Sequence, residues 1–199
     1  GHKVTVICSH PIYPKWKPEK SFKKLSGIDI IRGGSFIWYT KNQVIRRIIL
    51  EIWFALYSFK VIIKHRNKFD VIIPVFPPSL AFYIIVPLLS KKILKVGMVH
   101  DLQEVYAKGK KGILNNMISF FINKIEGFTF RKCDNLIFLS EEMKNTAMDF
   151  YDLKADKLHV QYPFATIKGD PKTNDLESVL PSDKKHVVYS GALGEKQNP

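Results

Sequence analysis

The fold is decided by residues 70–100, which read DVIIPVFPPSLAFYIIVPLLSKKILKVGMVH. Within them, 71–90 carry no charge over a length that could cross a bilayer. Four prolines interrupt this run, and a proline inside a helix removes a hydrogen bond and clashes with the preceding turn. We therefore interpret it as a strand, 70–76, and a helix that Pro78 opens near its first turn, and not as a membrane span. A second apolar strand follows at 93–99.

Short apolar runs and longer helical patterns alternate along the rest of the chain. The short runs are rich in Val and Ile and continuously apolar, which is typical of strands covered on both faces. The predicted strands are 3–8, 28–31, 70–76, 93–99, 135–139, 157–162 and 186–190. The predicted helices are 42–66, 79–91, 112–132 and 141–151, the last of them capped by Ser140. This alternation predicts an α/β fold with a doubly wound parallel sheet.

The alternating pattern fades after Pro163. Residues 165–185 are polar and contain two prolines and a glycine, which is typical of a linker, and a fresh strand begins at His186. We therefore expect a complete domain at 3–164, a linker at 165–185, and the first strand and loop of a further domain at 186–199.

Composition and charge restrict the class of partner. Hydrophobic residues make up 46% of the chain, as in ordinary globular proteins, and 31 Lys plus Arg against 18 Asp plus Glu give a formal charge of +13. Such a charge favours nucleic acid, an acidic membrane surface or phosphate-bearing small molecules. Cys8 and Cys133 have no second Cys or His at metal-ligand spacing, so we expect free thiols and no metal.

The helix at 42–66 has two apolar faces. One is expected to pack on the sheet and comprises Ile45, Ile48, Ile49, Ile52, Ala55, Leu56, Phe59, Ile62 and Ile63. The other mixes cations with large apolar residues: Arg46, Leu50, Trp53, Tyr57, Lys60 and Lys64. The mixed face suits the interface of an anionic bilayer, with Trp53 and Tyr57 in the lipid headgroups. Alternatively, a neighbouring loop or a further domain covers Leu50 and Trp53.

The segment at 10–24 repeats this mixture of basic and aromatic residues. It contains Lys15, Lys17, Lys20, Lys23 and Lys24 among Tyr13, Trp16 and Phe22. It suits lipid headgroups or single-stranded nucleic acid, or it is a solvated loop. No recognised nucleic-acid module is present, so we assign His10, Lys15, Trp16 and Lys17 to acceptor or membrane contacts and expect no nucleic acid.

In a doubly wound sheet, ligands bind beyond the carboxyl ends of the strands. The polar residues expected there are Ser9, His10, Ser79, His100, Asp101, Ser140, Glu141 and Glu142. A His such as His100 can donate, accept or titrate near neutrality. Alternatively, His100 caps a loop carbonyl and Asp101 caps the next helix. RGGSF at 32–36 supplies two glycines without the context of a phosphate-binding motif.

Five ordered segments together resemble the N-terminal half of GT-B glycosyltransferases. They are DVIIPVFPPSLAFYI, KVGMVHDLQE, FTFRKCDNLIFLSEEMKN, KLHVQYPFA and HVVYSGALGEKQN. They are most similar to the large retaining family that builds bacterial capsules, colanic-acid-type polysaccharides and lipid-linked sugars. The resemblance implies two Rossmann-like domains, of which the N-terminal one receives the acceptor and the C-terminal one binds the nucleotide-sugar donor.

The resemblance also suggests roles for single residues. YSGALGEK matches the first strand and loop of the donor domain, which places Gly191, Gly194 and Lys196 against the donor's phosphates. His100 matches a strand-end His that contacts the donor sugar in many members, and we take His100 and Asp101 as catalytic and Ser140 and Glu141 as donor-binding. The family's glycine-rich loop after the first strand is missing, and Ala192 stands where an Arg is common. The resemblance implies no metal or other cofactor.

The function implied is a retaining glycosyltransferase acting at the inner face of the cell membrane. It would move a sugar from a nucleotide-sugar to a lipid-linked or polysaccharide acceptor, with the departing phosphate taking the proton of the acceptor hydroxyl. Residues 1–199 would then be an excised acceptor-side domain that is inactive alone. The alternative is a non-catalytic, membrane-associated subunit that binds the acceptor and recruits a separate donor-binding chain.

Overall fold

The structure is a computed structural model that describes residues 1–11, 18–21, 24–34, 40, 43–65, 68–102, 113–163 and 185. The chain divides into two compact units, Gly1–Pro163 and Phe164–Pro199. Apart from Lys185, the described residues belong to the first unit. The expected linker and the expected strand at 186–190 therefore lie almost wholly outside the described residues.

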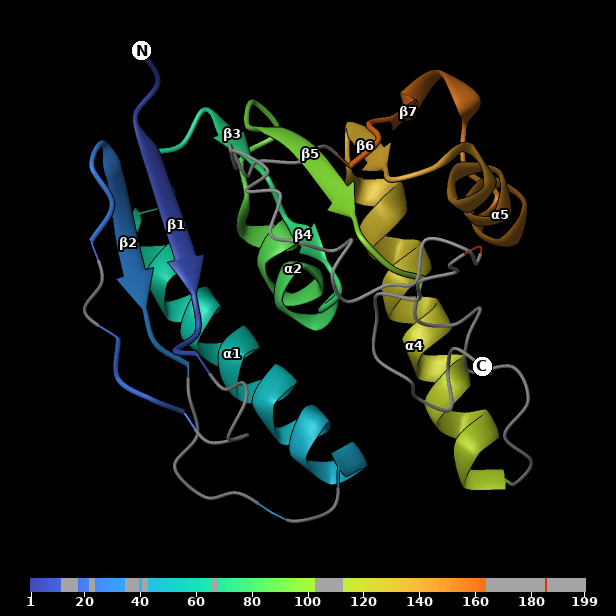
Figure 1. The fold of residues 1–199 in the computed structure, drawn as a ribbon, viewed down its shortest axis with the longest axis horizontal. Coiled ribbons are helices and arrows are strands. Elements are labelled where there is room, and N and C mark those ends of the chain that lie inside the picture. Colours follow the sequence, from blue (N-terminus) through green and yellow to red (C-terminus); the bar gives the residue numbers. More distant parts are fainter. Residues whose placement is uncertain are drawn as a thin grey trace. The chain divides into compact units, whose positions relative to one another are not determined.

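The strands of the first unit pair in parallel, as the sequence predicts (Figure 1). Their bounds are β1 Val4–Cys8, β2 Ile28–Arg32, β3 Val71–Ile72, β4 Val75–Phe76, β5 Leu94–Val99, β6 Asn135–Phe138 and β7 Leu158–Val160. They form two sheets: β1 pairs with β2 in one, and the other has the order β3-β5-β6-β7, with β4 also paired with β5. The predicted strand at 70–76 is interrupted because Pro74 has no N–H to donate, although its carbonyl still accepts from Met98 N at 2.8 Å.

Three helices begin and end within one residue of their predicted bounds, whereas the helix predicted at 79–91 ends at Ile85. The helices are α1 Gln43–His65, α2 Leu80–Ile85, α4 Ile113–Lys132 and α5 Glu141–Tyr151, with short 3₁₀ turns at Val86–Leu88 and Ala155–Lys157. The predicted cap of α5 is confirmed, since Ser140 is extended and its hydroxyl accepts from Met143 N at 3.1 Å. Within the described residues, no helix has the length and apolar composition needed to cross a membrane.

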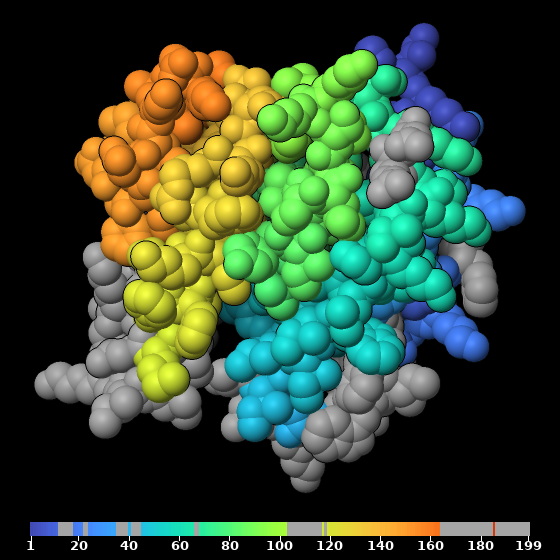
Figure 2. Space-filling view, turned by 180° about the vertical axis from the view of Figure 1, so that it is seen from behind, coloured from blue at the N-terminus to red at the C-terminus, as the bar shows by residue number. Residues whose placement is uncertain are grey.

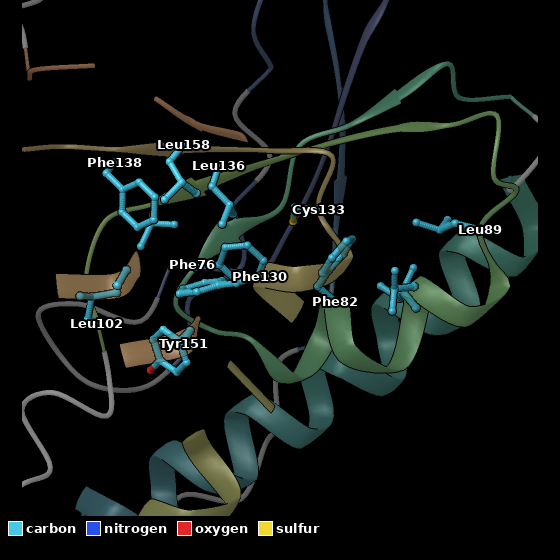
Figure 3. Close-up of a cluster of buried hydrophobic side chains, with 14 of the residues drawn as sticks. Phe76, Phe82, Leu89, Leu102, Phe130, Cys133, Leu136, Phe138, Tyr151 and Leu158 are labelled. Carbon is cyan, nitrogen blue, oxygen red and sulfur yellow. The ribbon is translucent and has the colours of Figure 1, made fainter. Parts of the chain in front are cut away.

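One hydrophobic core joins the sheet to all four α-helices. Phe130 of α4 lies at its centre, with ring centroids 5.3 Å from Phe76 of β4 and 5.2 Å from Tyr151 of α5 (Figure 3). Cys133 is a free thiol in this core, and burial raises its pKa to about 12, so it stays protonated. Seen from behind, α1, α2 and α4 lie side by side across the covered face of the sheet (Figure 2).

The opposite face of both sheets departs from the expectation of strands covered on both faces. Its alternate apolar residues are 39–56% exposed: Val4, Val6, Val71, Ile73, Val75 and Leu94. Residues of the other parity, such as Ile7, Ile72 and Phe76, pack in or against the core. An apolar run thus indicates a strand but does not ensure that both of its faces are covered.

The predicted orientation of α1 is only partly right. Five of the residues expected on the sheet are 43–51% exposed: Ile45, Ile48, Ile52, Leu56 and Ile63. Ala55 and Ile62 of the predicted face are buried, together with Ser58 and Val61, which were not expected there. Small side chains at Ala55 and Ser58 let α1 approach its neighbour α2 closely, and Glu51 accepts from Leu80 N at 3.2 Å, where α2 begins. A helix that is apolar nearly all round does not specify by periodicity which side it buries.

Candidate functional site

The carboxyl ends of four strands form a row. The register pairs Phe76 with Val99, Val99 with Phe138, and Phe138 with Val160. The residues that follow them therefore stand next to one another: Pro77, His100, Leu139 and Gln161. Two hydrogen bonds continue the ladder past the strands, from His100 N to Phe76 O at 2.8 Å and from Gln161 N to Phe138 O at 2.9 Å. This edge is where a parallel sheet binds its ligands.

His100 has an exposed side chain whose imidazole makes no hydrogen bond to any described residue. Its backbone N–H is held by Phe76, so the strand end fixes the position of the residue while its imidazole remains free to bind. Asp101 is half-buried, and its carboxylate accepts from Leu102 N at 3.0 Å. Asp101 thus shapes the turn that presents His100, and the helix it was alternatively expected to cap would begin outside the described residues.

Ser140 and Glu141 follow Leu139 at the same edge, but both already make local contacts. The Ser140 hydroxyl caps α5, and the Glu141 carboxylate forms an ion pair with Lys144 at 2.5 Å. The two acidic residues in the first turn of α5 match the positive end of its dipole. Donor binding by Ser140 and Glu141 therefore stays a prediction, and Gly191, Gly194 and Lys196 lie outside the described residues.

Of the residues assigned to the acceptor or the membrane, the structure describes His10, Trp53 and Tyr57. His10 Nδ1 accepts from Ser21 N at 3.3 Å, so the imidazole ties together two described parts of the β1–β2 connection. Lys15, Trp16 and Lys17 lie outside the described residues. Trp53 is 44% exposed, as expected for an outer face.

The placement of Tyr57 on the outer face of α1 is wrong. Its hydroxyl donates to Arg32 O at 3.0 Å, and its ring lies so close to Gly33 that a Cβ there would fall 2.2 Å from Tyr57 Cζ. Tyr57 is therefore half-buried between α1 and the end of β2. The reason is the glycine pair after Arg32, because only a residue without a side chain admits the ring at this distance.

Sequence reasoning missed Arg32, the last residue of β2. It lies beside Cys8, the last residue of β1, and its Nη1 donates to Cys8 Sγ at 3.3 Å. The only local signal was RGGSF, which has no recognisable motif context. The contact partner is 24 residues earlier in the chain, so the arrangement becomes visible only after the strands pair.

The opposite edge of the sheet holds an ion pair with a structural role. Lys95 Nζ lies 3.0 Å from Asp134 Oδ2, which also accepts from Lys95 N at 2.8 Å. Partial burial opposes ionisation of Asp134, but these bonds together hold its pKa below the usual range. The pair joins the start of β5 to the residue before β6, away from the row of strand ends. In the part of the chain that the structure describes, no group of three acidic, His or Cys residues could hold a metal ion.

Comparison with known proteins agrees with this architecture. Residues 1–166 match Glycosyltransferase Family 4. The chain is also 26% identical over 228 aligned positions to "Putative colanic acid biosynthesis glycosyl transferase WcaI" of Escherichia coli (strain K12). That alignment covers 99% of this chain and 52% of the relative, so the chain spans about half the length of the protein it matches.

Proposed function

Because the chain belongs to Glycosyltransferase Family 4, we propose that it is the acceptor-binding half of a retaining glycosyltransferase that builds cell-surface polysaccharide. The donor would be a nucleotide-sugar and the acceptor a lipid-linked or polysaccharide chain. The observation that supports this best is the row of strand ends, in which an exposed imidazole at His100 stands over the ligand edge of a parallel sheet. Similarity to a colanic acid biosynthesis protein favours a polysaccharide product.

The proposed reaction transfers the sugar from the donor phosphate to an acceptor hydroxyl. The bond between the sugar's anomeric carbon and the donor phosphate breaks, a bond to the acceptor oxygen forms on the same face, and the departing phosphate takes the hydroxyl proton. His100 would hydrogen-bond the transferred sugar and orient it, and Asp101 would hold the turn that carries His100. Gly191, Gly194 and Lys196 would receive the donor's phosphates, with Lys196 balancing their charge.

The alternative, a non-catalytic subunit that binds the acceptor for a separate donor-binding chain, uses the same surface. The two proposals differ in what should follow Pro199 in the gene. The transferase requires an open reading frame for a donor domain, and the subunit requires a stop codon. Both versions place acceptor binding in the described unit.

Hydrogen exchange of the purified chain tests that placement. We expect a detergent-solubilised lipid extract of the producing bacterium to slow exchange at Ser79, which follows β4. A mixture of UDP-, GDP- and dTDP-sugars should leave this amide unchanged, because the donor contacts proposed above lie at other residues. Lys95, at the opposite edge of the sheet, is the internal control. Slowing by nucleotide-sugars with none by the lipid extract would assign the chain to the donor side instead.

We also propose peripheral binding to the anionic inner face of the cell membrane, with a different surface of α1 from the one predicted. Exposed Ile48, Ile52 and Leu56 form an apolar stripe beside Trp53, and Lys60 and Lys64 are exposed along its flank. On α4, Met117, Phe120 and Phe121 are 53–58% exposed, and Lys124 Nζ lies over the Phe120 ring. Apolar side chains next to lysines favour an acidic lipid surface, with each lysine contributing about 1 kcal/mol.

The chain should sediment with vesicles that contain phosphatidylglycerol, should not sediment with pure phosphatidylcholine vesicles, and should be released by salt. Replacing Ile52 and Leu56 by Ser together should weaken this binding at least about tenfold, because two inserted aliphatic side chains are lost. The matched control is Val71→Ser with Val75→Ser, which removes equally exposed aliphatic residues from the sheet face. Equal sedimentation with both lipids, or equal weakening by the two double variants, would contradict the proposal.

A further inference from the structure

Arg32 lies at the carboxyl edge of the β1-β2 sheet, the kind of edge at which parallel sheets bind ligands. It ends β2, and its register partner Cys8 ends β1, so the two side chains share one face at the carboxyl edge of two parallel strands. The chain leaves this edge through Ser9 and His10 on one side and through Gly33 and Gly34 on the other. The transferase reaction proposed above does not use this part of the edge.

The guanidinium of Arg32 is only weakly satisfied. Its one hydrogen bond among the described residues goes to Cys8 Sγ at 3.3 Å, and a thiol sulfur is a weak acceptor. Its Nε is buried and has no partner in the described part of the chain. Asp29, the acidic residue of β2, has the opposite parity and pairs with Thr5. A half-buried guanidinium with five donors and no described carboxylate beside it is suited to an incoming anion.

The backbone at Arg32 is fixed on both sides. Its carbonyl accepts from the Tyr57 hydroxyl at 3.0 Å, and Gly33 N donates to Cys8 O at 3.0 Å. Gly34 is buried with φ +65°, a conformation that favours glycine, and a Cβ there would fall 3.0 Å from Phe54 Cα. Two strands and α1 therefore hold the residue in place before any ligand arrives, which lowers the entropy lost on binding.

We propose that Arg32 binds a phosphate group of the acceptor. The planar fork of a guanidinium matches two phosphate oxygens. The exposed Lys20 precedes Ser21, whose N–H donates to His10 at this end of the β1–β2 connection, and it adds positive charge for a multiply charged group. The identity of the molecule that carries the phosphate rests on the proposed function, whereas the binding of a phosphate at Arg32 does not.

Calorimetric titration of inorganic pyrophosphate into the purified chain at low salt tests the site. Arg32→Gln should weaken binding at least about tenfold, because a charged hydrogen-bond donor is lost. Arg32→Lys keeps the charge but loses the planar fork, so its affinity for pyrophosphate should lie between those of the unaltered chain and Arg32→Gln. Lys91→Gln removes one exposed charge before β5 and should stay within about twofold of the unaltered chain. Circular dichroism checks that each variant is folded, and Arg32→Lys carries the test if Arg32→Gln is not.

Competition then identifies the source of the phosphate. Farnesyl diphosphate in detergent should displace pyrophosphate at lower concentration than UDP does if the phosphate belongs to a lipid-linked acceptor. The reverse order would overturn the acceptor assignment. No pyrophosphate binding by the unaltered chain, unchanged affinity in both Arg32 variants, or an equal loss in Lys91→Gln would overturn the site itself. None of these titrations requires sugar transfer, so the site and the transferase activity can fail separately.

Discussion

Replacing Phe130 by Ala should lower the free energy of unfolding of the chain by about 3–5 kcal/mol, since a fully buried aromatic side chain is lost and a cavity remains. Phe130 is 1% exposed, and its ring meets Phe76, Phe138 and Tyr151 edge to face, with centroids 5.2–6.5 Å apart. These rings belong to β4, β6 and α5, so the cavity would open where a helix and the sheet meet (Figure 3). Urea unfolding followed by circular dichroism measures the change.

Phe120→Ala is the matched control, because it makes the same substitution on the same helix. Phe120 is 57% exposed, and the Phe121 ring and Lys124 Nζ lie beside it. Its loss should therefore change the free energy of unfolding by less than about 1 kcal/mol. If both variants lost the same stability, α4 would not pack on the sheet through the face described above.

His100→Ala should lower kcat/KM of the complete gene product about a hundredfold or more, the loss expected when a positioned catalytic group is removed. The imidazole is exposed at the end of β5, while the backbone N–H is fixed by Phe76 O at 2.8 Å. The substitution removes the side chain and leaves this backbone bond, so the fold should be unaffected. The measurement is the release of nucleoside diphosphate during sugar transfer.

His159→Ala is the control for that loss. His159 is an exposed histidine of β7 whose Nε2 lies 3.0 Å from Asn135 Oδ1, within the sheet and not at its carboxyl edge. Its replacement should leave transfer unchanged. Equal activity of the His100 variant and the unaltered enzyme would remove His100 from the site and leave the row of strand ends without its proposed catalytic group.

The sequence predicted the secondary structure well because the signals for it are local. The helix expected at 141–151 occurs at Glu141–Tyr151, where Ser140 caps it, and the helix expected at 42–66 occurs at Gln43–His65. The strand expected at 70–76 is divided into β3 and β4 at Pro74, and both parts pair with β5. The parallel pairing of the strands was also predicted correctly, because strands and helices alternate along the chain.

The side of α1 that packs inward could not be predicted. Isoleucines and leucine lie on one side of the helix, and Trp53, Tyr57 and Leu50 on another, so either side could be buried. The choice is made by partners far along the chain. Gly33 admits the Tyr57 ring, and the Leu80 N–H at the start of α2 donates to the Glu51 carboxylate.

Only part of the candidate site could be predicted, because some of its features depend on partners far along the chain. His100 directly follows an apolar run, so its place at a strand end is visible in the sequence. Arg32 also ends a strand, but its significance arises from the unsatisfied guanidinium beside Cys8, which no local pattern encodes. The exposed apolar face of the strands could not be predicted from the sequence either, because strands with one covered face and strands with two have the same apolar composition here.

Sugar transfer by the complete gene product tests the central claim most directly. Membranes of the producing bacterium, radiolabelled nucleotide-sugars and the purified enzyme should give label in the lipid-linked or polysaccharide fraction. Residues 1–199 alone should give none, because a donor-binding half is required. Label transferred by the complete enzyme and lost in His100→Ala is the predicted result. No transfer by the complete enzyme from any nucleotide-sugar supplied, or equal transfer by residues 1–199 alone, would contradict the account.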